Sequence, residues 1–163
     1  MAVVLQEIGT HSAKLVAALK QLDASSWVAK GASETYAEQL ESCRQQSQAL
    51  AGEAQAMAST PEKLSGALLL FFRLESLENM LNSVQQAAAK YQSPQVAQAL
   101  ASLYGEGGAS RERLRSYIIN LATEREHQFD VMDREAQRCR ATLMAAPPPQ
   151  PCKAAPAPTR KKK

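Results

Sequence analysis

The chain has 163 residues, a length typical of one domain that folds without a metal ion or a disulfide. Its 7 glycines, 8 prolines and 5% aromatic residues exclude a β-sandwich or barrel, which needs many turns and aromatic strands. The net charge is +3, but residues 145–163 hold five bases and no acid, so the net charge of residues 1–144 is slightly negative. This excludes a strongly basic nucleic-acid-binding face in residues 1–144.

The first apolar stripe lies near the N-terminus and has the spacing of a helix. Its members are three or four residues apart, with Ser12 filling the one polar position. They are Leu5, Ile8, Leu15, Leu19 and Leu22. The stripe predicts an amphipathic helix, which Asp23 and the pair Ser25-Ser26 interrupt.

Residues 27–36, "WVAKGASETY", contain the only tryptophan and connect the first helix to the second. Gly31 can adopt the positive φ that ends a helix, and Ser33 is a plausible cap for the next one. We interpret Trp27 as an aromatic plug over the end of the core, its indole N–H reaching a helix-end carbonyl. The alternative is a platform of Trp27 and Tyr36 for a peptide or small ligand.

Two further stripes follow, separated by a predicted helix start at Ser59-Thr60-Pro61-Glu62, where a hydroxyl cap precedes proline and an acid. The second stripe is Tyr36, Leu40, Cys43, Ser47, Leu50, Ala54 and Met57. The third is Ala67, Leu70, Leu74, Leu77, Leu81, Val84, Ala88 and Tyr91. Both keep heptad-like spacing and predict long helices.

The last part of the body contains a short helix and a long one. Ser93-Pro94 starts the short helix, which carries Val96, Leu100, Leu103 and Tyr104, and residues 105–108 are predicted to be a flexible glycine loop. Ser110 opens the final helix, whose predicted core stripe is Leu114, Ile118, Leu121, Phe129, Met132, Ala136, Cys139 and Leu143. Arg125 and Gln128 lie near this stripe and make it less regular.

These elements predict an all-α fold. We expect an antiparallel four-helix bundle of long helices over residues 1–144, with residues 94–104 as a short extra helix. The alternative is a longer coiled coil that a second chain completes, because stripes rich in Ala, Ser and Cys also pack between protomers. We expect residues 145–163 to form a disordered, basic tail, because they are rich in proline, alanine and lysine.

The sequence shows no cluster of residues with the pattern of a catalytic site. Cys43 and Cys139 fall on predicted core stripes, where a thiol is an inert apolar group, and Cys152 lies in the tail. We expect free thiols, because the simple helix order places Cys43 far from Cys139. If the short helix counts as a full pass of the bundle, the second and last long helices become antiparallel and a Cys43–Cys139 disulfide becomes conceivable. The sequence contains no Gly-x-Ser-x-Gly motif, no phosphate-loop glycine pattern and no Cys-x-x-Cys pair, and the glycines at residues 105–108 follow a predicted helix and not a strand. We therefore expect no enzyme activity and no cofactor.

One spacing is also used by metal-binding bundles. Glu124 and His127 form a Glu-x-x-His pair on one face of the last helix, and Glu75 and Glu78 could add carboxylates. A metal-dependent oxidase is thus a remote alternative. Only one of the two required motifs is present, so the simpler interpretation is a solvated charged face and no bound metal.

The end of the tail carries four adjacent bases: Arg160, Lys161, Lys162 and Lys163. They could bind nucleic acid or an anionic membrane weakly and in a salt-sensitive way. The simpler interpretation is a solubilising tail, since no aromatic side chain accompanies the charges.

The sequence therefore predicts a non-catalytic helical-bundle protein that acts by helix-mediated association, with itself or with another helical protein. Its alternative is an adaptor that binds an acidic surface through the basic tail. We see no secretory leader and no apolar run of the ~20 residues that span a membrane, so a cytoplasmic location is the default. Export with a removed leader stays open. The candidate interaction residues are Trp27, Tyr36, Arg160, Lys161, Lys162 and Lys163.

Overall fold

The computed structural model describes residues 1–145, and their regular structure is entirely helical. The helices are α1 (Ala2–Lys20), α2 (Ala24–Ala29), α3 (Thr35–Ala58), α4 (Leu64–Tyr91), α5 (Pro94–Glu106) and α6 (Gly108–Ala145). Because this part of the chain contains no strand, the all-α prediction is confirmed. None of these helices is both long and apolar enough to cross a membrane.

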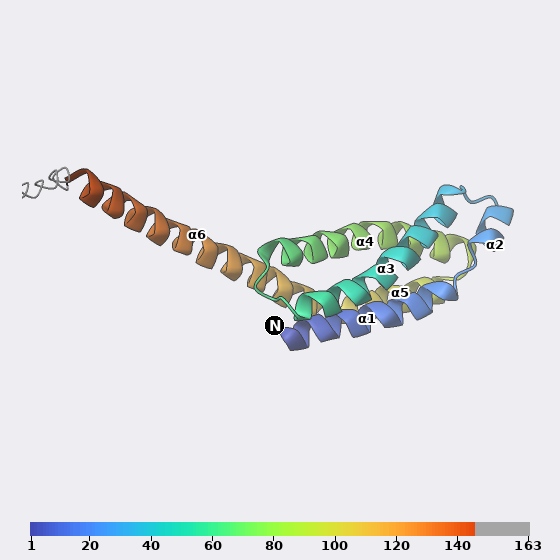
Figure 1. Cartoon of the computed structure of the whole chain (residues 1–163). Helices are drawn as coiled ribbons and strands as arrows, with labels where there is room; N and C mark the ends of the chain where they lie inside the picture. Colours follow the sequence, from blue (N-terminus) through green and yellow to red (C-terminus); the bar gives the residue numbers. More distant parts are fainter. Residues whose placement is uncertain (146–163) are drawn as a thin grey trace, which may run out of the picture. The chain divides into compact units, whose positions relative to one another are not determined.

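Residues 1–125 form one compact unit around a single apolar core (Figure 1). α1 contacts α3 and α5, and α4 contacts the same two helices, so these four lie around the core. The three predicted stripes supply most of it, and Leu5, Leu15, Leu50, Leu77 and Leu81 are almost completely buried. The periodicity of the sequence thus identified the faces of α1, α3 and α4 that are buried here.

α5 belongs to the core of this unit, whereas we expected residues 94–104 to be a short extra helix beside the bundle. It contacts both α1 and α4, and its Leu100 and Tyr104 are buried in the core. The hydroxyl of Ser93 caps its first turn by accepting a hydrogen bond from the Val96 N–H, as a serine before proline favours.

The predicted loop at residues 105–108 is wrong, because only Gly107 separates α5 from α6. Gly107 continues the helical hydrogen bonds at both sides: its N–H donates to the Tyr104 carbonyl, and its own carbonyl accepts from the Arg111 N–H. A Cβ atom at this position would lie 2.8 Å from Cδ2 of His11. The glycine therefore allows α1 to approach closely. α6 begins directly after α5, with helical hydrogen bonds on both sides of Gly107.

The predicted helix start at residues 59–62 is also wrong, since α4 begins at Leu64. Residues 60–63 instead form a turn in which the Lys63 N–H donates to the Thr60 carbonyl, with Pro61 at the position that turns favour. Side chains of α6 donate hydrogen bonds to the backbone carbonyls of this turn. The Tyr117 hydroxyl donates to Pro61 (2.8 Å) and Arg125 donates to Glu62 (3.2 Å).

The short helix α2 was not predicted. The carboxylate of Asp23 caps it by accepting from the backbone N–H groups of Ser25 and Ser26. An aspartate before two serines is a capping signal that the sequence did contain. In Figure 1, α2 lies at the end of the α1 and α3 pair that is remote from the N-terminus.

α6 enters the core only through its first turns. Leu114 and Ile118 are buried, whereas every side chain from Glu126 to Met144 is exposed. A second unit begins at Glu126. The prediction that Phe129, Met132, Ala136, Cys139 and Leu143 form a buried core stripe is therefore wrong, although the helix that carries them is present as predicted.

Candidate association surface

Trp27 lies inside the molecule, with 0% of its surface exposed. Its Nε1–H donates to the Oε1 atom of Gln92 (3.1 Å), which follows the last residue of α4. The acceptor is thus a side-chain amide and not the helix-end carbonyl that we expected. The backbone N–H of Asp23 approaches the same oxygen at 3.5 Å. These contacts give the indole a packing role at the end of the core.

The residues between Trp27 and Tyr36 close this end of α2 and open α3. Gly31 has φ = +88°, and the Ala32 N–H donates to the Trp27 carbonyl. The Ser33 hydroxyl accepts from the Thr35 N–H, but the residue that caps α3 is Glu34, without a side-chain hydrogen bond, so the predicted Ser33 cap is wrong. Tyr36 is half-buried, and its ring centroid lies 6.4 Å from that of Tyr91. Trp27 and Tyr36 therefore present no shared open platform.

The other candidate interaction residues, Arg160, Lys161, Lys162 and Lys163, lie outside the described residues, as do Cys152 and the rest of the predicted tail apart from Ala145, which is the last residue of α6. Among the described cysteines, Cys43 is buried and Cys139 is exposed, and both are free thiols. Burial raises the pKa of Cys43 to about 12, so its thiol stays protonated and unreactive.

The residues proposed for the remote metal site are not brought together as a ligand set. Glu78 accepts a hydrogen bond from the Tyr104 hydroxyl (3.3 Å), and Glu124 and His127 are exposed on α6. Within residues 1–145 no three His, Cys, Asp or Glu side chains are close enough to share a metal ion.

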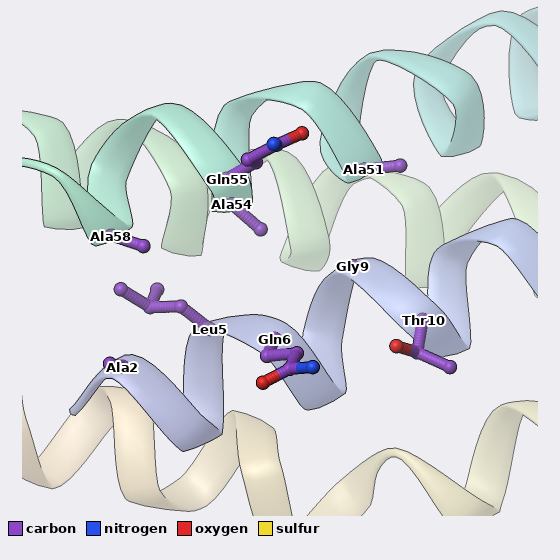
Figure 2. Close-up of a pocket in the computed structure, with 9 residues that line it drawn as sticks. All are labelled: Ala2, Leu5, Gln6, Gly9, Thr10, Ala51, Ala54, Gln55 and Ala58. Atoms are coloured by element: carbon purple, nitrogen blue, oxygen red, sulfur yellow. The ribbon is translucent and has the colours of Figure 1, made fainter.

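An open groove of about 550 Å³ runs between α1 and α3 (Figure 2). Its lining residues are Ala2, Leu5, Gln6, Gly9 and Thr10 of α1, and Ala51, Ala54, Gln55 and Ala58 of α3. The lining has no acid, base or nucleophilic thiol. It has a shape that could receive a side chain but no group that could perform general acid–base chemistry.

His11 belongs to a tightly packed cluster with Gly107, Tyr104 and Arg111. The Arg111 guanidinium lies 4.0 Å from the Tyr104 ring centroid and donates to the Tyr104 carbonyl (3.0 Å). Burial lowers the pKa of His11, and the nearby charge of Glu106 opposes this shift. Burial also raises the pKa of Tyr104. These groups join α1, α5 and α6, and they form a structural cluster.

The largest set of exposed apolar side chains lies on the second half of α6. Phe129 exposes 70% of its surface, Met132 64% and Leu143 76%. Together with Ala136 and Cys139 they follow a 3-4-3-4 spacing, which places them on one face of the helix. We call these five residues the α6 stripe. The sequence revealed the stripe and its periodicity, but it assigned the stripe to the core of the same chain.

Apolar side chains that line one exposed face of a helix are typical of interaction surfaces. The other faces of this long helix are mostly polar, and they carry Asp130, Asp133, Arg134 and Arg138. The geometry thus fits association with another helix.

Comparison with models of known protein families gives no match, and neither curated proteins nor solved structures match the chain.

Proposed function

We propose that this chain is a non-catalytic helical-bundle protein that acts by association through the α6 stripe, with a second copy of itself or with another helical protein. In this proposal α1, α3, α4 and α5 form an antiparallel four-helix bundle, with the first turns of α6 extending its fourth side. The first turns of α6 are packed in the bundle, and the α6 stripe contacts the partner.

The observation that carries this proposal is the exposure of a regular apolar stripe on a continuous helix. Exposing Phe129, Met132 and Leu143 to water is unfavourable, at roughly 25 cal/mol per Å² of apolar surface. Covering them with a partner helix recovers that free energy. The protonated, buried thiol of Cys43 and the acid- and base-free groove between α1 and α3 support the non-catalytic part.

A photo-crosslinking experiment in cells tests the proposal. Benzoylphenylalanine replaces Phe129 in one variant and Val131 in a second, and Val131 is the matched control because it is exposed but lies off the stripe. We expect a covalent adduct from position 129 and little from position 131. The absence of any adduct at position 129 would contradict association through the stripe.

The second candidate function is an adaptor whose basic tail binds an acidic surface. The observation that favours it is the run from Arg160 to Lys163, which contains no acid. Deleting residues 147–163 is then expected to abolish salt-dependent binding to duplex DNA or to anionic vesicles. Equal binding with and without the tail would rule this function out.

A further inference from the structure

The α6 stripe has the register of a two-stranded coiled coil. Phe129, Ala136 and Leu143 occupy the a positions of a heptad, and Met132 and Cys139 occupy the d positions. The helix is continuous over all five residues. Every one of them is exposed, so the stripe has the width and length to receive one further helix.

We propose that the occupant is a second copy of the same helix, in a parallel and in-register pair. This inference rests on the proposed function and specifies its partner and orientation. In a parallel pair each residue of the stripe lies beside its own counterpart, so the contact is the same on both chains and closes by two-fold symmetry.

Charge complementarity argues for this occupant. In a parallel pair the g residue of one chain lies beside the e residue five positions later on the other. Here that rule places Glu135 beside Arg140 of the second copy, and symmetry repeats the pair. Neither side chain forms an ion pair with any residue in the described part of the chain. The same helix therefore carries both the acidic residue and the basic residue of this pair.

The second g–e pair raises no objection to the same arrangement. It joins Gln128 to Asp133 of the second copy, so it contains a single charge and no like-charge repulsion. Two opposite-charge pairs at the surface contribute little to affinity, but they favour the in-register parallel pair over a parallel pair shifted by one heptad. The apolar stripe supplies the affinity and these charges supply the register.

The length of the stripe sets the strength that we expect. It spans two heptads, and Ala136 fills one a position with a small side chain. A short coiled coil of this kind buries a modest apolar area, so we expect a dimer that dissociates on dilution.

Cys139 makes the orientation measurable. In a parallel, in-register pair the two Cys139 side chains face each other in one d layer, where their Cα atoms can approach within the ~7 Å that a disulfide needs. Oxidised glutathione can then accept two electrons and two protons from the two thiols, which leaves one interchain disulfide and two molecules of reduced glutathione. In an antiparallel pair a d residue lies beside an a residue, and Cys139 has no Cys139 opposite it.

The test uses the full chain with Cys152→Ser. Of the two remaining thiols, both in the described part of the chain, Cys139 is exposed and Cys43 is buried. Light scattering gives the molar mass, and a non-reducing gel after treatment with oxidised glutathione shows the disulfide. The matched control is Cys139→Ser with Ala141→Cys, which moves the thiol two residues to the exposed outer face. We expect a two-chain mass in both proteins and a covalent dimer only with Cys139.

A second matched pair tests whether the stripe itself makes the contact. Met132→Glu places a carboxylate in the d layer of each chain, and Val131→Glu places the same charge one residue away. We expect Met132→Glu to reduce the covalent dimer at least tenfold and to give a one-chain mass. Val131→Glu is expected to behave like the parent, and equal behaviour of the two variants would overturn the proposed contact.

The remaining outcomes separate this inference from the proposed function. A two-chain mass without a Cys139 disulfide would overturn the parallel register. A one-chain mass at every concentration would overturn the second copy as occupant, and an adduct of position 129 with a different protein would then leave the proposed function standing.

Discussion

At the residue scale, the contact between Trp27 and Gln92 joins segments that are 65 residues apart in the sequence. The indole N–H is buried, so losing its acceptor leaves a polar group without a partner. We expect Gln92→Ala to lower the free energy of unfolding by about 1–3 kcal/mol. Chemical denaturation followed by circular dichroism measures this loss.

The matched background is Trp27→Phe, which keeps an aromatic ring but has no N–H to satisfy. Gln92→Ala is expected to cost less in this background, because only the weaker contact with the Asp23 backbone is then lost. The same loss in both backgrounds would contradict the assigned hydrogen bond.

His11 gives the molecule a predicted pH dependence. Burial lowers its pKa in the folded chain, while Arg111 and Lys14 act in the same direction and Glu106 acts against them. As the pH falls below about 6.5, the unfolded chain takes up this proton before the folded chain does. The stability that neutral His11 provides is therefore complete above about pH 6.5 and decreases toward lower pH.

Urea unfolding at about pH 7.5 and about pH 5 tests this effect. We expect His11→Gln to lose less stability between the two pH values than the parent chain does. His127→Gln is the matched control, since His127 is exposed on α6, and it is expected to follow the parent. If the parent and His11→Gln lost equal stability, the burial of neutral His11 would be disproved.

At the element scale, two glycines predict opposite effects of the same substitution. Gly31 follows α2 with φ = +88°, a conformation that costs an L-residue about 1–2 kcal/mol. Gly52 lies exposed inside α3, with no atom within 4 Å of an added Cβ. We expect Gly31→Ala to lower the free energy of unfolding by about 1–2 kcal/mol. Gly52→Ala is expected to raise it by about 0.5–1 kcal/mol.

Both glycine variants are measured by thermal or urea unfolding of the full chain. A loss of stability in Gly52→Ala would mean that its position in the helix is not open. An unchanged stability in Gly31→Ala would mean that the end of α2 does not require positive φ.

The elements also show which parts of the fold the sequence could predict. The periodic stripes identified the buried faces of α1, α3 and α4, because apolar spacing and burial have the same physical cause. The turn at residues 60–63 could not be predicted in this way. Its hydroxyl, proline and acid suit a helix start as well as a turn, and the choice depends on Tyr117 and Arg125, which are more than 50 residues away.

α6 shows the corresponding limit for the candidate site. Periodicity reports that one face of a helix is apolar, but it does not report what covers that face. The spacing of Leu114 and Ile118 continues in Phe129 and Met132, yet the first pair is buried and the second is exposed. The pattern therefore predicted a core stripe where the chain instead presents a surface.

At the scale of the whole molecule, helical packing has two functions. Residues 1–125 bury their own apolar faces, and the buried thiol of Cys43 and the enclosed indole of Trp27 belong to that packing. Residues 126–144 are exposed and carry the α6 stripe. In our proposal, a second copy of the chain covers this stripe.

Light scattering on the full chain over a range of concentrations tests whether a second copy covers the stripe, with Met132→Glu and Val131→Glu measured beside it. We predict a molar mass that rises from one chain to two for the parent and for Val131→Glu, and that stays at one chain for Met132→Glu. A mass of one chain for the parent at every concentration, or a dimer that Met132→Glu leaves intact, would contradict it.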